Sequence, residues 1–161
     1  MLPPPTPHTD PRDLKSGSMV SDRNGYYDSQ NIVAVGNPAS PTLVCVLHHS
    51  ENREGGPGLK LSSTVSTDGG RTWSALHAID DPERQSHDGY MLVVRADDGR
   101  DRIVVFYGWN KGSQYPPGAS PDLPELRRTD MQLDEGYWFR ISDDGGTSWG
   151  HRRWLVPIRR T

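Results

Sequence analysis

The sequence predicts an all-β protein, organised as a β-propeller of which only about two four-stranded antiparallel blades are present. Three observations predict this class. Apolar runs of four to six residues, rich in β-branched side chains, alternate with Gly, Pro, Asn and Asp. The series of four such runs occurs twice, and the same turn motif appears in each series. The 17 Gly and 14 Pro among 161 residues suit short strands joined by many turns and make long helices unlikely.

The charge and cysteine content exclude several classes of function. The 18 Lys+Arg against 21 Asp+Glu give a net charge of −3, so no basic excess exists to bind nucleic acid or an anionic membrane surface. The single cysteine, Cys45, excludes an internal disulfide, and no Cys/His spacing resembles a zinc site. No signal-peptide pattern and no membrane-length apolar run is present. We therefore expect a soluble chain without metal, cofactor, nucleic-acid or membrane partner, in a compartment that the sequence leaves open.

The first 24 residues are rich in Pro, Ser, Asp and Lys without any periodicity, which predicts an extended or disordered arm. The partial propeller is then expected over 25–161. Blade one, over 26–80, contains four predicted strands, at 31–35, 42–47, 62–65 and 76–79. Blade two, over 87–158, contains four more, at 91–94, 102–107, 137–141 and 154–158.

The two blades can be aligned by a fixed offset. A shift of 60 residues places Asp28 on Asp88, Ile32 on Leu92 and Leu43 on Ile103 without a gap, and later in the blade the shift becomes 76. The second blade therefore carries 16 more residues between its second and third strands. Internal repeats of four short strands are typical of propeller blades. The alternative is two pairs of hairpins in a sandwich or barrel.

The turn motif is the most specific signal in the chain. An Asp that accepts backbone N–H groups, with Gly supplying a positive φ, closes a tight hairpin. A Trp follows each turn, and we expect its ring to pack across its own blade. The motif residues are Ser66, Asp68, Gly70, Thr72 and Trp73 in the first blade, and Ser142, Asp144, Gly146, Ser148 and Trp149 in the second.

These two turns resemble the Asp-box of the bacterial neuraminidase repeat (BNR) proteins, whose best-known members are the sialidases. The resemblance covers about 26–158, and the longer phrases at 54–58 and 128–146 also look like bacterial sialidase-like proteins. It implies a six-bladed propeller, of which this chain would be an N-terminal fragment. Closing the ring would then need the remaining blades or self-assembly.

Propeller topology sorts the candidate site residues to the end of the blades opposite the Asp-boxes. There the resemblance implies a pocket that binds an anionic sugar, with acid/base groups for glycosidic cleavage. The candidate catalytic residues are Asp28 and Asp88, although an Asp at the start of a strand can equally bond its own turn. Candidate substrate-binding residues are Gln30, His49, Arg53, Glu54, Tyr90, Arg128 and Asp130.

The resemblance implies a sialidase-like glycoside hydrolase that is exo-acting on sialic acid or another anionic sugar, with the fragment inactive alone. One departure weakens this expectation: sialidases carry Arg-Ile-Pro at the start of the first blade, whereas Ser29-Gln30-Asn31 stands near that position here. Two alternatives remain open. The chain could belong to a non-catalytic propeller that binds carbohydrate or protein, or to a polysaccharide lyase on the same fold.

Overall fold

The computed structural model describes residues 18–21, 25–50, 59–79, 85–110, 137–151 and 154–155. This part of the chain consists of strands and turns, and it contains no helix long and apolar enough to cross a membrane.

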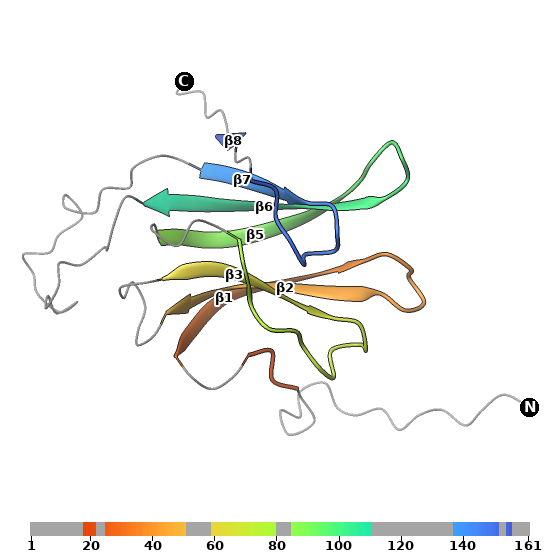
Figure 1. Ribbon diagram of the computed structural model, residues 1–161, viewed down its shortest axis with the longest axis horizontal. Helices are drawn as coiled ribbons and strands as arrows, with labels where there is room; N and C mark the ends of the chain where they lie inside the picture. The colour runs from red at the N-terminus through yellow and green to blue at the C-terminus, as the bar shows by residue number, and fades with distance from the viewer. Residues whose placement is uncertain are drawn as a thin grey trace, which may run out of the picture.

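The strands form two four-stranded antiparallel sheets, so the all-β prediction is confirmed. The first sheet follows chain order through β1 (Tyr26–Val35), β2 (Thr42–Ser50), β3 (Lys60–Ser66) and β4 (His77–Ala78). The second sheet repeats that order with β5 (Gln85–Arg95), β6 (Asp101–Asn110), β7 (Tyr137–Ser142) and β8 (Trp154–Leu155). The sheets lie one above the other, with both first hairpins pointing to the same end of the molecule (Figure 1).

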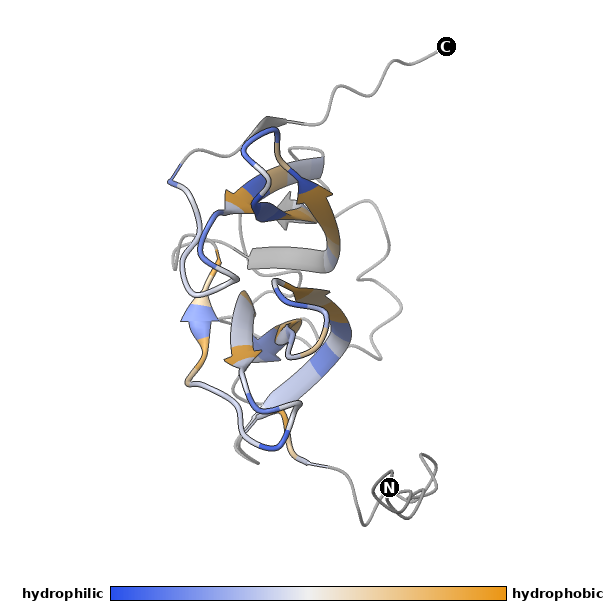
Figure 2. Cartoon of the chain, turned by 90° about the vertical axis from the view of Figure 1, so that its right-hand side faces the viewer, coloured by the Kyte–Doolittle hydropathy of each residue, from blue (hydrophilic) through white to orange (hydrophobic). Residues whose placement is uncertain are grey.

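The hydrophobic core lies between the sheets. Val44, Val46 and Leu61 of the first sheet pack with Ile103 and Val105 of the second, and all five are at most 1% exposed. Their alternation along β2 and β6 gives each strand one face toward the partner sheet, as the two-residue side-chain period of a strand requires. Apolar segments accordingly run through the strands of both sheets, whereas the turns at the end seen in Figure 2 are hydrophilic.

The strand register corrects one detail of the predicted repeat. Ile32 pairs with Cys45, and the pair at the corresponding place in the second sheet is Met91 with Val105. The offset between the two first strands is therefore one residue less than the predicted 60, and the second hairpin holds the extra residue. By the same register the counterpart of Asp28 is His87 rather than Asp88. The valine-rich runs hid this slip because both faces of these strands are apolar.

The offset predicted for the third strands agrees with the register. Leu43 pairs with Ser66 in the first sheet, and Ile103 pairs with Ser142 in the second. Both Asp-box serines thus end their strands at equivalent places.

The tryptophans of the two boxes differ in their surroundings. Trp149 is 8% exposed, and its Nε1–H donates to Ser63 Oγ of the first sheet at 2.9 Å. Ser63 Oγ in turn donates to the Gly146 carbonyl at 2.8 Å. Trp149 therefore joins the two sheets instead of packing only within its own, because its turn reaches over the core. Trp73 is half-buried.

Part of the predicted N-terminal arm belongs to the described residues. Residues 18–21 precede β1, and Ser18 Oγ donates to the carbonyl of Gly70 in the first Asp-box turn. This contact ties the end of the arm to the turn.

Candidate functional site

Both first strands carry a β-bulge near the end opposite the Asp-box turns. The pairing register shifts between Asp28 and Asn31 in β1, and between His87 and Tyr90 in β5. Ser29 in the first bulge has φ +50°, a conformation that side-chain-bearing residues rarely adopt. Bulges re-aim neighbouring side chains and often lie next to functional sites, and strained residues concentrate there too.

Gly89 lets the second bulge approach the first sheet closely. A Cβ at this position would lie 2.5 Å from Leu61 Cδ1 and 2.7 Å from Val46 Cγ1. Beside it, the Met91 N–H donates to Asn31 Oδ1 at 3.0 Å, which joins β5 to β1. The two bulged strands are thus held side by side at this end.

A carboxylate, an imidazole and a phenol meet at the first bulge. His48 Nδ1 lies 3.1 Å from Asp28 Oδ1, and the Tyr26 hydroxyl donates to Asp28 Oδ2 at 3.0 Å. The His48 side chain is 3% exposed and that of Asp28 is 27% exposed, so the imidazole is enclosed while the carboxylate still reaches solvent. We call these three residues the Asp28 cluster.

The register of the sheet creates this cluster. Asp28 is the direct partner of His48 in the β1–β2 ladder, and Leu61 of β3 pairs with His48 on its other side. Side chains that face each other across a ladder lie on the same face of the sheet. The contact is therefore built on two strands rather than on a loop.

The histidine at Asp28 is not the one singled out from the sequence. Neighbouring residues of a strand point to opposite faces, so His49 lies on the other face from His48. There its ring lies 4.8 Å from that of Tyr27, centroid to centroid. The sequence signal that could have identified His48 is the pairing of the first two strands, which places it opposite Asp28. The proposed contact of His49 with substrate stays a prediction.

The other candidate residues are placed as follows. Gln30 is exposed within the first bulge, and Tyr90 follows the second bulge with 64% of its surface exposed. Asp88 lies in the backbone of the second bulge, but its side chain is outside the described part. Four candidates lie outside the described residues altogether: Arg53, Glu54, Arg128 and Asp130.

The two Asp-box turns share most of their internal hydrogen bonds. Asp68 Oδ1 accepts from the N–H groups of Arg71 and Thr72, both at 2.9 Å, and Oδ2 accepts from the Thr72 hydroxyl at 2.7 Å. Asp144 accepts in the same way from the N–H and hydroxyl of Ser148, at 2.9 and 2.5 Å. The serine that ends each strand donates to its own Asp at 2.8 Å.

These bonds lower the pKa of both aspartates. The Thr72 N–H, the Thr72 hydroxyl and the Ser66 hydroxyl hold the pKa of Asp68 at about 2, below its usual 3.8. Burial acts against ionisation of Asp144, but bonds from Ser148 and Ser142 outweigh it and lower its pKa as well. Both carboxylates accept several hydrogen bonds from their own turns, and these bonds hold the hairpins closed.

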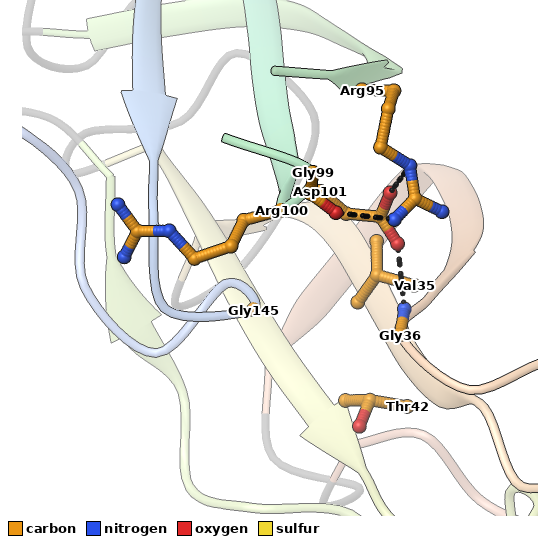
Figure 3. A pocket seen from close by; sticks show the side chains of 8 residues that line it. All are labelled: Val35, Gly36, Thr42, Arg95, Gly99, Arg100, Asp101 and Gly145. Atoms are coloured by element: carbon orange, nitrogen blue, oxygen red, sulfur yellow. Dashed lines mark hydrogen bonds and ion pairs between the residues drawn. The ribbon is translucent and has the colours of Figure 1, made fainter. Parts of the chain in front are cut away.

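Among the described residues, a hollow of about 350 Å³ opens at the Asp-box end of the sheets. Its lining includes Val35, Gly36, Arg95, Asp101 and Gly145, from both first hairpins and the second box turn. Figure 3 shows Arg95 and the Gly36 amide both directed at the Asp101 carboxylate, at 3.1 and 2.8 Å. Asp101 thus uses both oxygens within the protein, and no aromatic side chain lines the hollow.

Metal and thiol chemistry find little support in the described residues. In that part of the chain no three His, Cys, Asp or Glu side chains gather as metal ligands. Burial raises the pKa of the Cys45 thiol to about 11, so the nucleophilic thiolate is scarce at neutral pH.

The comparisons with known proteins give a structural relative. No family model matches the chain, and no curated protein matches it either. Among solved structures, the Hadza microbial sialidase Hz136 superposes with a TM-score of 0.55 at 18% sequence identity. The match covers 77% of this chain but only 25% of the sialidase. The likeness shows that the chain has a sialidase-like fold and spans about a quarter of that relative's length.

Proposed function

We propose that this chain forms two blades of a sialidase-like propeller that acts on a glycan carrying sialic acid or another anionic sugar. The observation that carries the proposal is the Asp28 cluster, which combines an accessible carboxylate, a buried imidazole and a phenol at the bulge of the first strand, β1. The similarity of fold to a microbial sialidase supports the same direction. Further blades, or further copies of the chain, would complete the ring.

In this proposal the reaction is hydrolysis of a glycosidic bond, in which water adds across the bond and the terminal sugar leaves. Asp28 and Asp88 act as acid/base groups in this proposal, a role that carboxylates have in most glycoside hydrolases. The candidate binding residues at this end hold the sugar through its hydroxyl groups and its charge.

A binding-only function is the second candidate, and the Asp28 cluster itself favours it. Both contacts of Asp28 place it as an acceptor, from the Tyr26 hydroxyl and from His48 when Nδ1 carries the proton. A carboxylate used in this way can accept ligand hydroxyls without giving up a proton.

Sialyllactose and lactose distinguish these functions. We expect the chain to bind sialyllactose more tightly than lactose in calorimetric titrations, and Asp28→Asn to weaken this binding about tenfold. Asp97→Asn, an exposed position in the far hairpin, is the matched control and should bind as the parent does. Release of sialic acid by the completed propeller, followed by chromatography, would support hydrolysis, and binding by the completed propeller without release would favour the binding-only function. Equal affinity for both sugars, or none for either, would contradict the proposal.

A further inference from the structure

His48 is a buried polar residue that is absent from the candidate site residues predicted from the sequence. It is 2% exposed, in a row of β2 side chains that otherwise contributes Val44 and Val46 to the core. A histidine in such a row is costly unless its ring nitrogens are hydrogen-bonded. Its partner on Nδ1 is the carboxylate of Asp28.

We propose that His48 is the positioning residue of Asp28 and that it orients this carboxylate to receive a sugar hydroxyl. The inference rests on the proposed function and deepens it, because it assigns the residue that prepares the acceptor. His48 does not touch the sugar and acts only through Asp28.

Two hydrogen bonds, one on each carboxylate oxygen, fix the orientation of Asp28. A carboxylate can accept about two hydrogen bonds on each oxygen. His48 occupies one position on Oδ1 and Tyr26 one position on Oδ2, so the plane of the carboxylate is set while each oxygen keeps room for a ligand. The exposed 27% of the Asp28 side chain is where that ligand would arrive.

The support behind His48 makes the orientation rigid. Leu61 is its ladder partner on β3 and is fully buried. A site held by packed strand residues keeps its geometry better than one held by a loop. The bulge at Ser29 interrupts the ladder between Asp28 and Asn31, and β1 is the terminal strand of its four-stranded sheet, so this carboxylate lies beside a bulge on an edge strand.

Two substitutions of His48 separate positioning from simple packing. The side-chain nitrogen of Asn lies where Nδ1 of His lies, whereas that of Gln lies near Nε2. We therefore expect His48→Asn to keep sialyllactose affinity within about threefold of the parent, and His48→Gln to lose about tenfold. His77→Gln, at the short β4, is the control and should not change affinity. Urea midpoints of all variants show whether each one folds.

The tautomer of His48 gives a readout that does not depend on any ligand. In ¹⁵N-resolved NMR spectra of the imidazole, we expect a proton on Nδ1 in the parent chain. Nδ1 without a proton would overturn the inference, since His48 would then donate nothing to Asp28.

Titrations of the parent chain and of His48→Gln test the proposed function and the inference separately. Sialyllactose binding that His48→Gln leaves unchanged would overturn the inference and leave the proposed function intact. Absence of binding by the parent chain would overturn the proposed function, and with it the role of Asp28 toward sugar.

Discussion

At the scale of single residues, the two Asp-box glycines are required for different reasons. One is required by its backbone conformation, and the other also by packing against the neighbouring sheet. Gly70 and Gly146 have the same φ of +85°. A Cβ on Gly70 would meet only ordinary contacts, the nearest at 3.5 Å, whereas a Cβ on Gly146 would lie 2.4 Å from Val44 Cγ1 of the other sheet. The backbone conformation demands glycine in both turns, but the packing demands it only in the second.

Alanine substitutions at these glycines should therefore differ in cost. We expect Gly70→Ala to lower the free energy of unfolding by about 1–2 kcal/mol, from the left-handed conformation alone. Gly146→Ala should cost at least about 1 kcal/mol more, because Val44 must move. Urea denaturation of both variants measures the difference. Equal losses would mean that the second turn does not press on the first sheet.

The Asp-box carboxylates predict how stability responds to acid. The pKa of Asp68 is about 2 in the folded chain and near 3.8 when the turn is undone. A lowered folded pKa stabilises the fold above the unfolded pKa, and this contribution is lost as the pH falls from about 4 to 2. Asp68→Asn should thus show a smaller decrease in urea midpoint between pH 5 and pH 3 than the parent does. The same decrease in both proteins would show that the box does not hold the ionised carboxylate.

At the scale of elements, Asp101 connects the two first hairpins. It begins β6, accepts from the Gly36 N–H of the other sheet at 2.8 Å, and pairs with Arg95 of its own sheet. Its side chain is 13% exposed, whereas Asp98, in the same turn, is 39% exposed and pairs with Arg100. Of these two aspartates, Asp101 is the one that bridges the sheets.

Removal of this bridge should loosen the hairpin end. We expect Asp101→Ala to cost about 1–3 kcal/mol, because the Gly36 N–H loses its acceptor. Asp98→Ala removes exposed contacts with Arg100 and Arg102, which do not cross between the sheets, and it should cost less than Asp101→Ala. Hydrogen exchange at the Gly36 amide gives the local readout, and it should quicken in Asp101→Ala alone. Unchanged exchange there would show that the bridge does not form in solution.

The elements were easier to predict from the sequence than their relation to each other. The apolar runs and the Asp-box turns gave all eight strands, because turn chemistry and β-branched side chains are local signals. The register of the first strands was wrong by one residue, since Ile32, Val33 and their neighbours offer apolar side chains to both faces. The bridging role of Trp149 was also missed, because it depends on where the second sheet lies.

At the scale of the whole molecule, the second sheet has an open outer face. Tyr90, Leu92 and Val94 on β5 are exposed there. Phe106 and Phe139, which pair in the ladder, stand 5.8 Å apart between ring centroids. Exposed apolar surface of this kind suits contact with another sheet. In the proposed propeller, the next blade would cover it.

The candidate site was only partly predictable. Asp28 was proposed because it precedes the predicted first strand at 31–35, and its end of the sheets was proposed from hairpin topology. The pairing with His48 depends on a cross-strand contact, and the choice between His48 and His49 depends on the face to which each points. The hydrophobicity pattern of the sequence predicts neither the cross-strand contact nor the face to which each histidine points. The hollow at the opposite end is formed by two hairpins and a turn from different parts of the chain, so no local sequence pattern predicts it.

The most direct test of the account is to map where a sialylated sugar binds. Amide chemical shifts of the ¹⁵N-labelled chain would be recorded during titration with sialyllactose, with lactose as the control. We predict changes that centre on residues 25–29 and 48–50, around the Asp28 cluster. Changes that centre instead on Gly36, Arg100 and Gly145 would place the sugar in the hollow at the Asp-box end and would contradict the account.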